Sequence, residues 1–233
     1  MKNLAPAIAA LTLICGMSAF SGFSASAQAG TDSPSILQKA SVFYDLNTLY
    51  PKDADNAYFN GFGMGYNIDF LVSKSLPLYV GTGLDLRFVF NNETIADAGN
   101  YNPIEAKAKT RFINLNLPIN VSYRVPVAEG FYLTPQLGLD LRAQLNGRSR
   151  VEANTTGPRN FGLYSTTTSN DIDLFSKDDL GSEHLKRFQF GWHAAVNFEY
   201  NRFNLGLSYG TDFVKLHKNL GASHFLVSLG YIF

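Results

Sequence analysis

The pentapeptide Gly-Leu-Asp-Leu-Arg occurs twice in the chain, at residues 83–87 and 138–142. In each copy an acid and a base stand two residues apart, so a β-strand would place both side chains on one face. The charged residues are Asp85, Arg87, Asp140 and Arg142. They suit either a charged path that passes ions or a network of ion pairs that fills a polar interior. Which of these two interpretations applies depends on the secondary-structure elements that carry the four residues.

Eight segments of alternating residues can position these side chains. They are residues 42–46, 62–72, 78–90, 113–125, 131–143, 188–200, 203–211 and 225–233. One face of each segment is almost entirely large and apolar and carries no charged residue, whereas the other face is polar or glycine. A period of two indicates β-strands. The sequence therefore predicts an all-β protein with an even number of antiparallel strands.

The polar faces gather the residues that we predict to form one network. They are Asp85, Arg87, Arg124, Asp140, Arg142, His193 and Glu199. Alternation alone allows two arrangements, a soluble lipocalin-like barrel with an apolar core or a membrane barrel with its apolar face outward. The composition is 14% aromatic and 16% charged, against about 25% charged in ordinary soluble domains. The formal net charge of zero argues against a nucleic-acid partner.

Three features favour the apolar-outward arrangement. Long connections, at 48–57, 91–109, 146–186 and 214–222, alternate with tight ones, as in outer-membrane barrels. Aromatic residues fall near both ends of the apolar rows and aliphatic residues between them, which predicts two interfacial belts. The last strand ends in an alternating row that resembles the terminal signal read by outer-membrane assembly machinery. That row is Phe225, Val227, Leu229, Tyr231 and Phe233.

The N-terminus reads as a secretion signal. A basic start is followed by a mostly apolar stretch and by Ala25-Ser26-Ala27, which has the A-x-A pattern of a cleavage site. We expect residues 1–27 to be cleaved, residues 28–37 to form a periplasmic segment, and residues 38–233 to form the barrel. The single cysteine, Cys15, lies in the signal, so the mature chain is expected to have no disulfide.

An eight-stranded barrel leaves an interior just wide enough for side chains. We therefore predict that Asp85, Arg87, Asp140 and Arg142 form a polar plug with Asn116 and His193, rather than a conducting path. His224 and Ser228 share a face but lie too far apart along a strand, at about 3.3 Å per residue, for a hydrogen bond. We predict no catalytic residue, cofactor or metal. A narrow porin and a lipid-modifying enzyme remain as alternatives.

Several short segments resemble the PorT-like outer-membrane β-barrel domain family. They are residues 113–119 (INLNLPI), 132–139 (YLTPQLGL), 188–191 (FQFG), 205–210 (LGLSYG) and 229–233 (LGYIF), and the resemblance covers residues 38–233. It implies a small eight-stranded barrel. Most members of that family have no assigned activity, and the relatives that give it its name serve in a protein-secretion system.

The sequence therefore predicts an antiparallel eight-stranded barrel in the bacterial outer membrane, with both termini periplasmic. Its function is expected to be binding, structural or accessory to secretion, exerted through the long loops. The expected partners are outer-membrane lipid, the barrel assembly machinery and other envelope proteins or extracellular ligands.

Overall fold

The computed structural model describes residues 34–51, 55–73, 75–97, 104–159, 162–180, 184–214, 216 and 220–233. The strands are β1 (Ile36–Pro51), β2 (Ala57–Ser73), β3 (Leu76–Asp97), β4 (Ile104–Tyr123), β5 (Val125–Ala128), β6 (Phe131–Arg159), β7 (Gly162–Asp173), β8 (Phe188–Tyr200), β9 (Phe203–Asp212) and β10 (Leu220–Ile232), and the helix is α2 (Lys177–Leu180). Among the described residues, no helix has the length and hydropathy to cross a membrane. The predicted signal, residues 1–27, lies outside this part of the chain.

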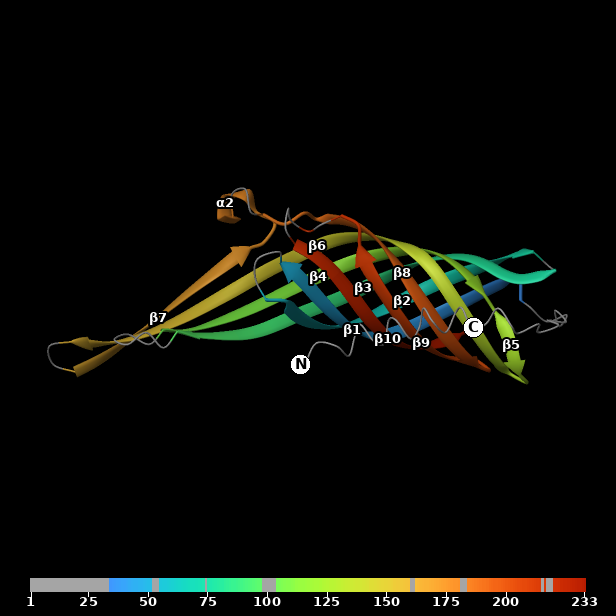
Figure 1. Ribbon diagram of the computed structural model, residues 1–233, viewed down its shortest axis with the longest axis horizontal. Coiled ribbons are helices and arrows are strands. Elements are labelled where there is room, and N and C mark those ends of the chain that lie inside the picture. Colours follow the sequence, from blue (N-terminus) through green and yellow to red (C-terminus); the bar gives the residue numbers. More distant parts are fainter. Residues whose placement is uncertain are drawn as a thin grey trace.

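Eight of the strands form a closed antiparallel ring (Figure 1). Their order is β1, β2, β3, β4, β6, β8, β9 and β10, and pairing of β10 with β1 closes the circle. The remaining strands are additions to the ring, because β5 extends the β4–β6 hairpin and β7 pairs with β6. The predicted fold class, an eight-stranded antiparallel barrel, is confirmed.

The two faces of the ring differ as the alternation predicts. Outward residues such as Val42, Leu137 and Leu229 keep about 60% of their surface exposed. Inward residues such as Asp45 and Glu199 are fully buried at 0% exposure. A soluble barrel would bury the first kind and expose the second. The apolar face therefore points outward and the polar face lines the interior.

The two ends of the ring differ in their connections. At one end, which we call the turn end, β2 and β3, β4 and β6, and β8 and β9 are joined by short connections, two of which contain the left-handed residues Gly130 (φ 70°) and Asn201 (φ 54°). The start of β1 and the C-terminal Phe233 also lie there, because Ile36 pairs with Phe70 and the Phe233 amide donates to the Gln38 carbonyl. We call the opposite end the hairpin end.

At the hairpin end, the structure corrects the prediction that residues 91–109 and 146–186 are loops. Most of these residues are strand, since β3 runs to Asp97, β4 begins at Ile104, and β6 and β7 form a hairpin over 146–173. The loops predicted at 48–57 and 214–222 are likewise shorter, because β1 ends at Pro51 and β10 begins at Leu220. Beyond the ring neither face of a strand contacts lipid, so the alternation that marks a membrane strand is lost.

The outer parts of β3, β4, β6 and β7 together form what we call the external sheet, which extends beyond the ring at the hairpin end (Figure 1). An extra residue in β6, Leu145, marks where it begins: Asn114 pairs with Gln144, whereas Ile113 pairs with Asn146. This is a β-bulge, which reverses the face on which the following β6 side chains lie, as described up to Ala153.

Candidate functional site

Glu199 on β8 is the centre of an ion cluster near the turn end. Its Oε2 accepts a 2.7 Å hydrogen bond from Nε of Arg124, and its Oε1 lies 3.2 Å from Nζ of Lys39. The Thr134 hydroxyl donates to Oε1 at 3.1 Å. Lys39 also lies 3.1 Å from Asp69. All of these side chains are buried, so each charge depends on its partners rather than on water.

A second network occupies the middle of the ring. Arg87 lies 3.4 Å from both Asp45 and Asp85. The Asn116 amide donates to Asp85 at 3.2 Å and to Asp140 at 2.8 Å. Asp140 in turn accepts a 2.8 Å hydrogen bond from Nδ1 of His193. The structure thus brings the two pentapeptides together through Asn116.

Arg142, the base of the second pentapeptide, has partners that its spacing does not indicate. It lies 3.4 Å from Asp212 on β9, and its Nη2 donates to Nδ1 of His224 on β10 at 3.2 Å. The pairing within one pentapeptide therefore occurs in β3 but not in β6. Sequence reasoning left Lys39, Asp45, Asp69, Asp212 and His224 out of the predicted network. Lys39 could have been found by extending the alternation of the first strand toward the N-terminus.

Glycine makes room for two of the buried carboxylates. A Cβ atom at Gly65 would overlap Oδ1 of Asp85, and one at Gly81 would overlap Oδ1 of Asp69. Both glycines lie on strands that neighbour the carboxylate they face. The inward glycines of β2 and β3 therefore help to place the charges, by allowing them to lie flat against the next strand.

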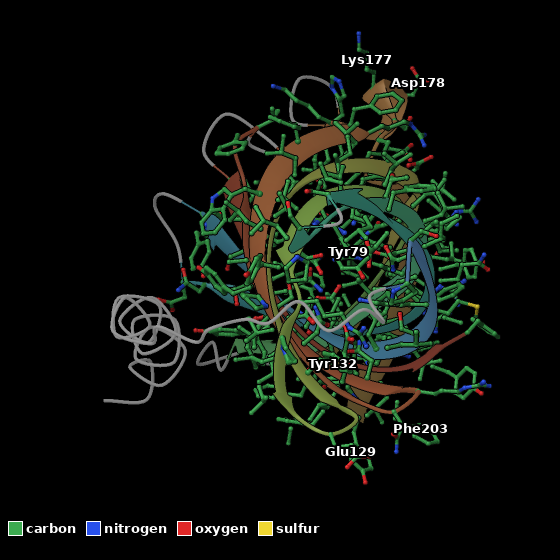
Figure 2. The ribbon with its side chains drawn as sticks, turned by 90° about the vertical axis from the view of Figure 1, so that its right-hand side faces the viewer. Tyr79, Glu129, Tyr132, Lys177, Asp178 and Phe203 are labelled. Carbon is green, nitrogen blue, oxygen red and sulfur yellow. The ribbon has the colours of Figure 1, made fainter. Side chains whose placement is uncertain are left out.

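Apolar side chains close the interior at both ends. At the hairpin end Phe59, Val89, Phe112 and Phe175 form a buried cluster, with Phe112 and Phe175 in edge contact at 6.4 Å between ring centroids. At the turn end Leu37, Tyr79 and Ile232 form another. Figure 2 looks along the barrel and shows Tyr79 inside the ring, with side chains filling the space around it. We call these clusters the two lids.

Between the lids lies a cavity of about 100 Å³, lined by Lys39, Asp69, Asp140, His193 and His224 among others. Its volume suits a few water molecules rather than an organic substrate. In the described part of the chain, neither His193 nor His224 has a hydroxyl or thiol as a hydrogen-bond partner. No group of side chains there could hold a metal ion.

The outer face of the external sheet carries a second concentration of charge. Register places Arg111 opposite Arg148, Lys109 opposite Arg150 and Lys107 opposite Glu152. Asp171 on β7 lies opposite Arg150 and accepts hydrogen bonds from it at 2.8 and 2.9 Å. The Arg150 guanidinium holds the pKa of the Asp171 carboxyl below its usual range. This acid therefore stays ionised to a lower pH than a free aspartate.

A sequence profile decides the family. The profile of the outer membrane protein beta-barrel domain family matches residues 19–216, which is most of the chain. The chain belongs to this family. Membership places the protein in the bacterial outer membrane, and it agrees with the apolar outer surface of the ring.

Other comparisons show looser likeness. Ail of Yersinia pestis is 15% identical, with a TM-score of 0.40, and the match covers 86% of this chain and 100% of Ail. Neisserial surface protein A is 11% identical, with a TM-score of 0.41 and coverage of 86% and 98%. The outer membrane enzyme PagL is 9% identical, with a TM-score of 0.39 and coverage of 80% and 98%. No curated protein sequence matches the chain. The family assignment thus rests on the sequence profile.

The predicted C-terminal assembly signal lies at the end of the ring's last strand. Phe225, Val227, Leu229 and Tyr231 pair with outward residues of β1, and Phe233 follows directly. Leu229 and Phe233 are exposed at 62% and 68%. The row is therefore on the apolar surface of the barrel, and its recognition by assembly machinery stays a prediction.

Proposed function

We propose that this barrel is a closed support for the external sheet, through which it acts as a binding, structural or secretion-accessory component of the envelope. In this proposal the hairpin end faces outward and both chain ends lie in the periplasm. The observation that carries it is the combination of a filled interior with a sheet that extends well beyond the ring. The secretion role follows the resemblance to PorT-like barrels, and envelope proteins or extracellular ligands are the partners.

The filled interior argues against a transport channel. Two apolar lids enclose two layers of paired charges, and the cavity between the layers is about 100 Å³. An ion would have to displace buried ion pairs to pass, which is costly in a low-dielectric interior. The same enclosure argues against an enzyme, because His193 and His224 lie on the inner face and not at the lipid surface.

We expect no steady open-channel current when the purified, folded protein is inserted into planar lipid bilayers. The reason is that the two lids and the layers of paired charges between them fill the interior along the barrel axis in the described part of the chain. A general porin inserted under the same conditions provides the positive control. Steady, reproducible conductance steps from this protein would contradict the closed barrel and favour the narrow porin.

The external sheet offers a free strand edge to a partner. Among the described strands, β7 pairs only with β6, so its other edge presents unpaired backbone groups. Such an edge can accept an additional strand from another chain. The residues Ser165–Asn170 are small and uncharged, and they contain no proline or charge that would block this pairing.

A photo-reactive amino acid at Ser169 is expected to give a discrete cross-linked product in intact cells, because Ser169 lies on β7 and is exposed. The matched control is the same amino acid at Glu129, which is exposed at the turn end (Figure 2). Products would be resolved by gel mobility and identified by mass spectrometry. Identical products at both positions, or none at Ser169, would contradict binding through the external sheet.

A further inference from the structure

Five cations gather on the outer face of the external sheet, close to the ring. They are Lys107, Lys109 and Arg111 on β4 and Arg148 and Arg150 on β6, and we call them the cationic face. Phe112 follows Arg111 in the chain and Gly147 precedes Arg148, and both face the hairpin-end lid. The alternation of the strands therefore turns the cations away from the barrel axis.

The cross-strand pairs of the cationic face set like charges against each other. Arg111 lies directly opposite Arg148, and Lys109 lies directly opposite Arg150. Directly opposed side chains on antiparallel strands are about 5 Å apart at Cβ, and like charges there are destabilising. Two neighbouring arginines at this spacing can bind one phosphate between their guanidinium groups.

Acidic residues neutralise only part of this charge. Glu152 lies 3.6 Å from Lys109, and Asp171 lies 2.8 Å from Arg150. Among the described side chains, Arg111 and Arg148 form no ion pair within 4 Å. Asp173 lies directly opposite Arg148 on β7 and offsets part of its charge, but within the described residues the pair closest to the ring is the one without a direct ion-pair partner.

The position of this pair matches the edge of the apolar surface. Ile113 is the next outward residue of β4 on the ring side of Arg111. Phe90 on β3 pairs with Arg111 and is an exposed aromatic residue of the apolar face. Phe62 and Phe88 stack just below it, with centroids 5.4 Å apart. Aromatic residues mark the interface between hydrocarbon and headgroups, so Arg111 and Arg148 lie at headgroup height.

We propose that the cationic face binds the phosphorylated headgroup of a lipid in the leaflet that surrounds the hairpin end. Arg111 and Arg148 hold one phosphate between them, and Lys107 and Lys109 contact further anionic groups of the same headgroup above it. The acyl chains then lie along the apolar outer face below Phe90 and Ile113. This inference is independent of which side of the membrane the hairpin end faces.

Native mass spectrometry of the folded protein in uncharged detergent tests the proposal. The probes are a bis-phosphorylated glucosamine-disaccharide lipid, the same lipid with both phosphates removed, and inorganic pyrophosphate. We expect retention of the phosphorylated lipid only. The variant Arg111→Gln/Arg148→Gln should weaken its binding by about tenfold or more, as expected for loss of charge-assisted hydrogen bonds.

The control variant Lys177→Gln/Arg202→Gln removes the same number of positive charges from exposed positions on α2 and at the turn end, and it should bind as the wild type does. Added phosphorylated lipid should raise the melting temperature of the wild type and control but not of the arginine variant. If the arginine variant does not fold, high salt should still weaken binding of the phosphorylated lipid by the wild type.

Three results would overturn the proposal. Equal retention of the dephosphorylated lipid would show that the headgroup phosphates are not recognised. Equal binding by the arginine variant would show that the cationic face is not the site. Binding of pyrophosphate as tightly as the lipid would indicate an ion site and not a lipid site.

Discussion

Replacing Glu199 by glutamine is expected to destabilise the folded barrel by about 3–5 kcal/mol, because it leaves two buried cations without their shared carboxylate. Glutamine keeps the size of the side chain and can still accept from Thr134, so the change isolates the charge. Arg124 loses its 2.7 Å partner and, among the described side chains, retains the face of Tyr132, at 3.5 Å from the ring centroid. Lys39 retains Asp69.

Urea unfolding in lipid vesicles, followed by the fluorescence of Trp192, the chain's single tryptophan, and by heat-modifiable gel mobility, measures this loss. Glu129→Gln, at an exposed turn position, is the matched control and should change stability by less than about 0.5 kcal/mol. The double variant Arg124→Gln/Glu199→Gln should recover more than half of the loss, since Lys39 and Asp69 still pair. A Glu199→Gln barrel as stable as the control would refute the importance of this cluster.

Replacing Arg87 by methionine is expected to cost a similar amount, about 3–5 kcal/mol, for the opposite reason. Here two carboxylates, Asp45 and Asp85, lose the guanidinium that lies 3.4 Å from each. The interior is especially sensitive to this change because its buried carboxylates (Asp45, Asp69, Asp85, Asp140, Glu199 and Asp212) already outnumber its buried lysine and arginine side chains (Lys39, Arg87, Arg124 and Arg142).

The same unfolding measurement applies, with Lys177→Met on α2 as the exposed control. Adding Asp45→Asn to Arg87→Met should restore part of the stability, because it removes one of the two unpaired charges. If the double variant were less stable than Arg87→Met alone, the loss would have to come from packing of Arg87 against Phe43, 5.6 Å from the ring centroid, and not from unpaired charge.

Alternation predicted the ring and the inward position of the pentapeptide charges, because a membrane barrel separates its two faces at every residue. It could not predict partners across the interior. The contacts of Arg142 with Asp212 and His224 depend on how β9 and β10 lie across from β6, and Lys39 lies before the predicted start of the first strand. Such contacts follow from the closed ring and not from spacing along one strand.

The strands of the external sheet were not predicted from the sequence, for a different physical reason. Above the membrane neither face of a strand must be apolar, so a strand there has the composition of a loop. The bulge at Leu145 adds to this, because the inward positions of β6 are even-numbered up to Gln144 and odd-numbered from Gly147 to Ala153. A pattern read without a change of phase would place Arg148 and Arg150 on the inner face.

Because Leu145 is an extra residue, the number of residues in β6, and not their identity, determines which side of the external sheet is cationic. Loss of this one residue would leave every arginine in place along the sequence and yet exchange the inner and outer sides of β6 beyond the ring. Arg148 would then compete with Phe112 and Phe175 for the space under the lid. Among homologous barrels, insertions and deletions at this point should therefore be rarer than substitutions of the arginines themselves, since a substitution alters one contact and a deletion inverts a surface.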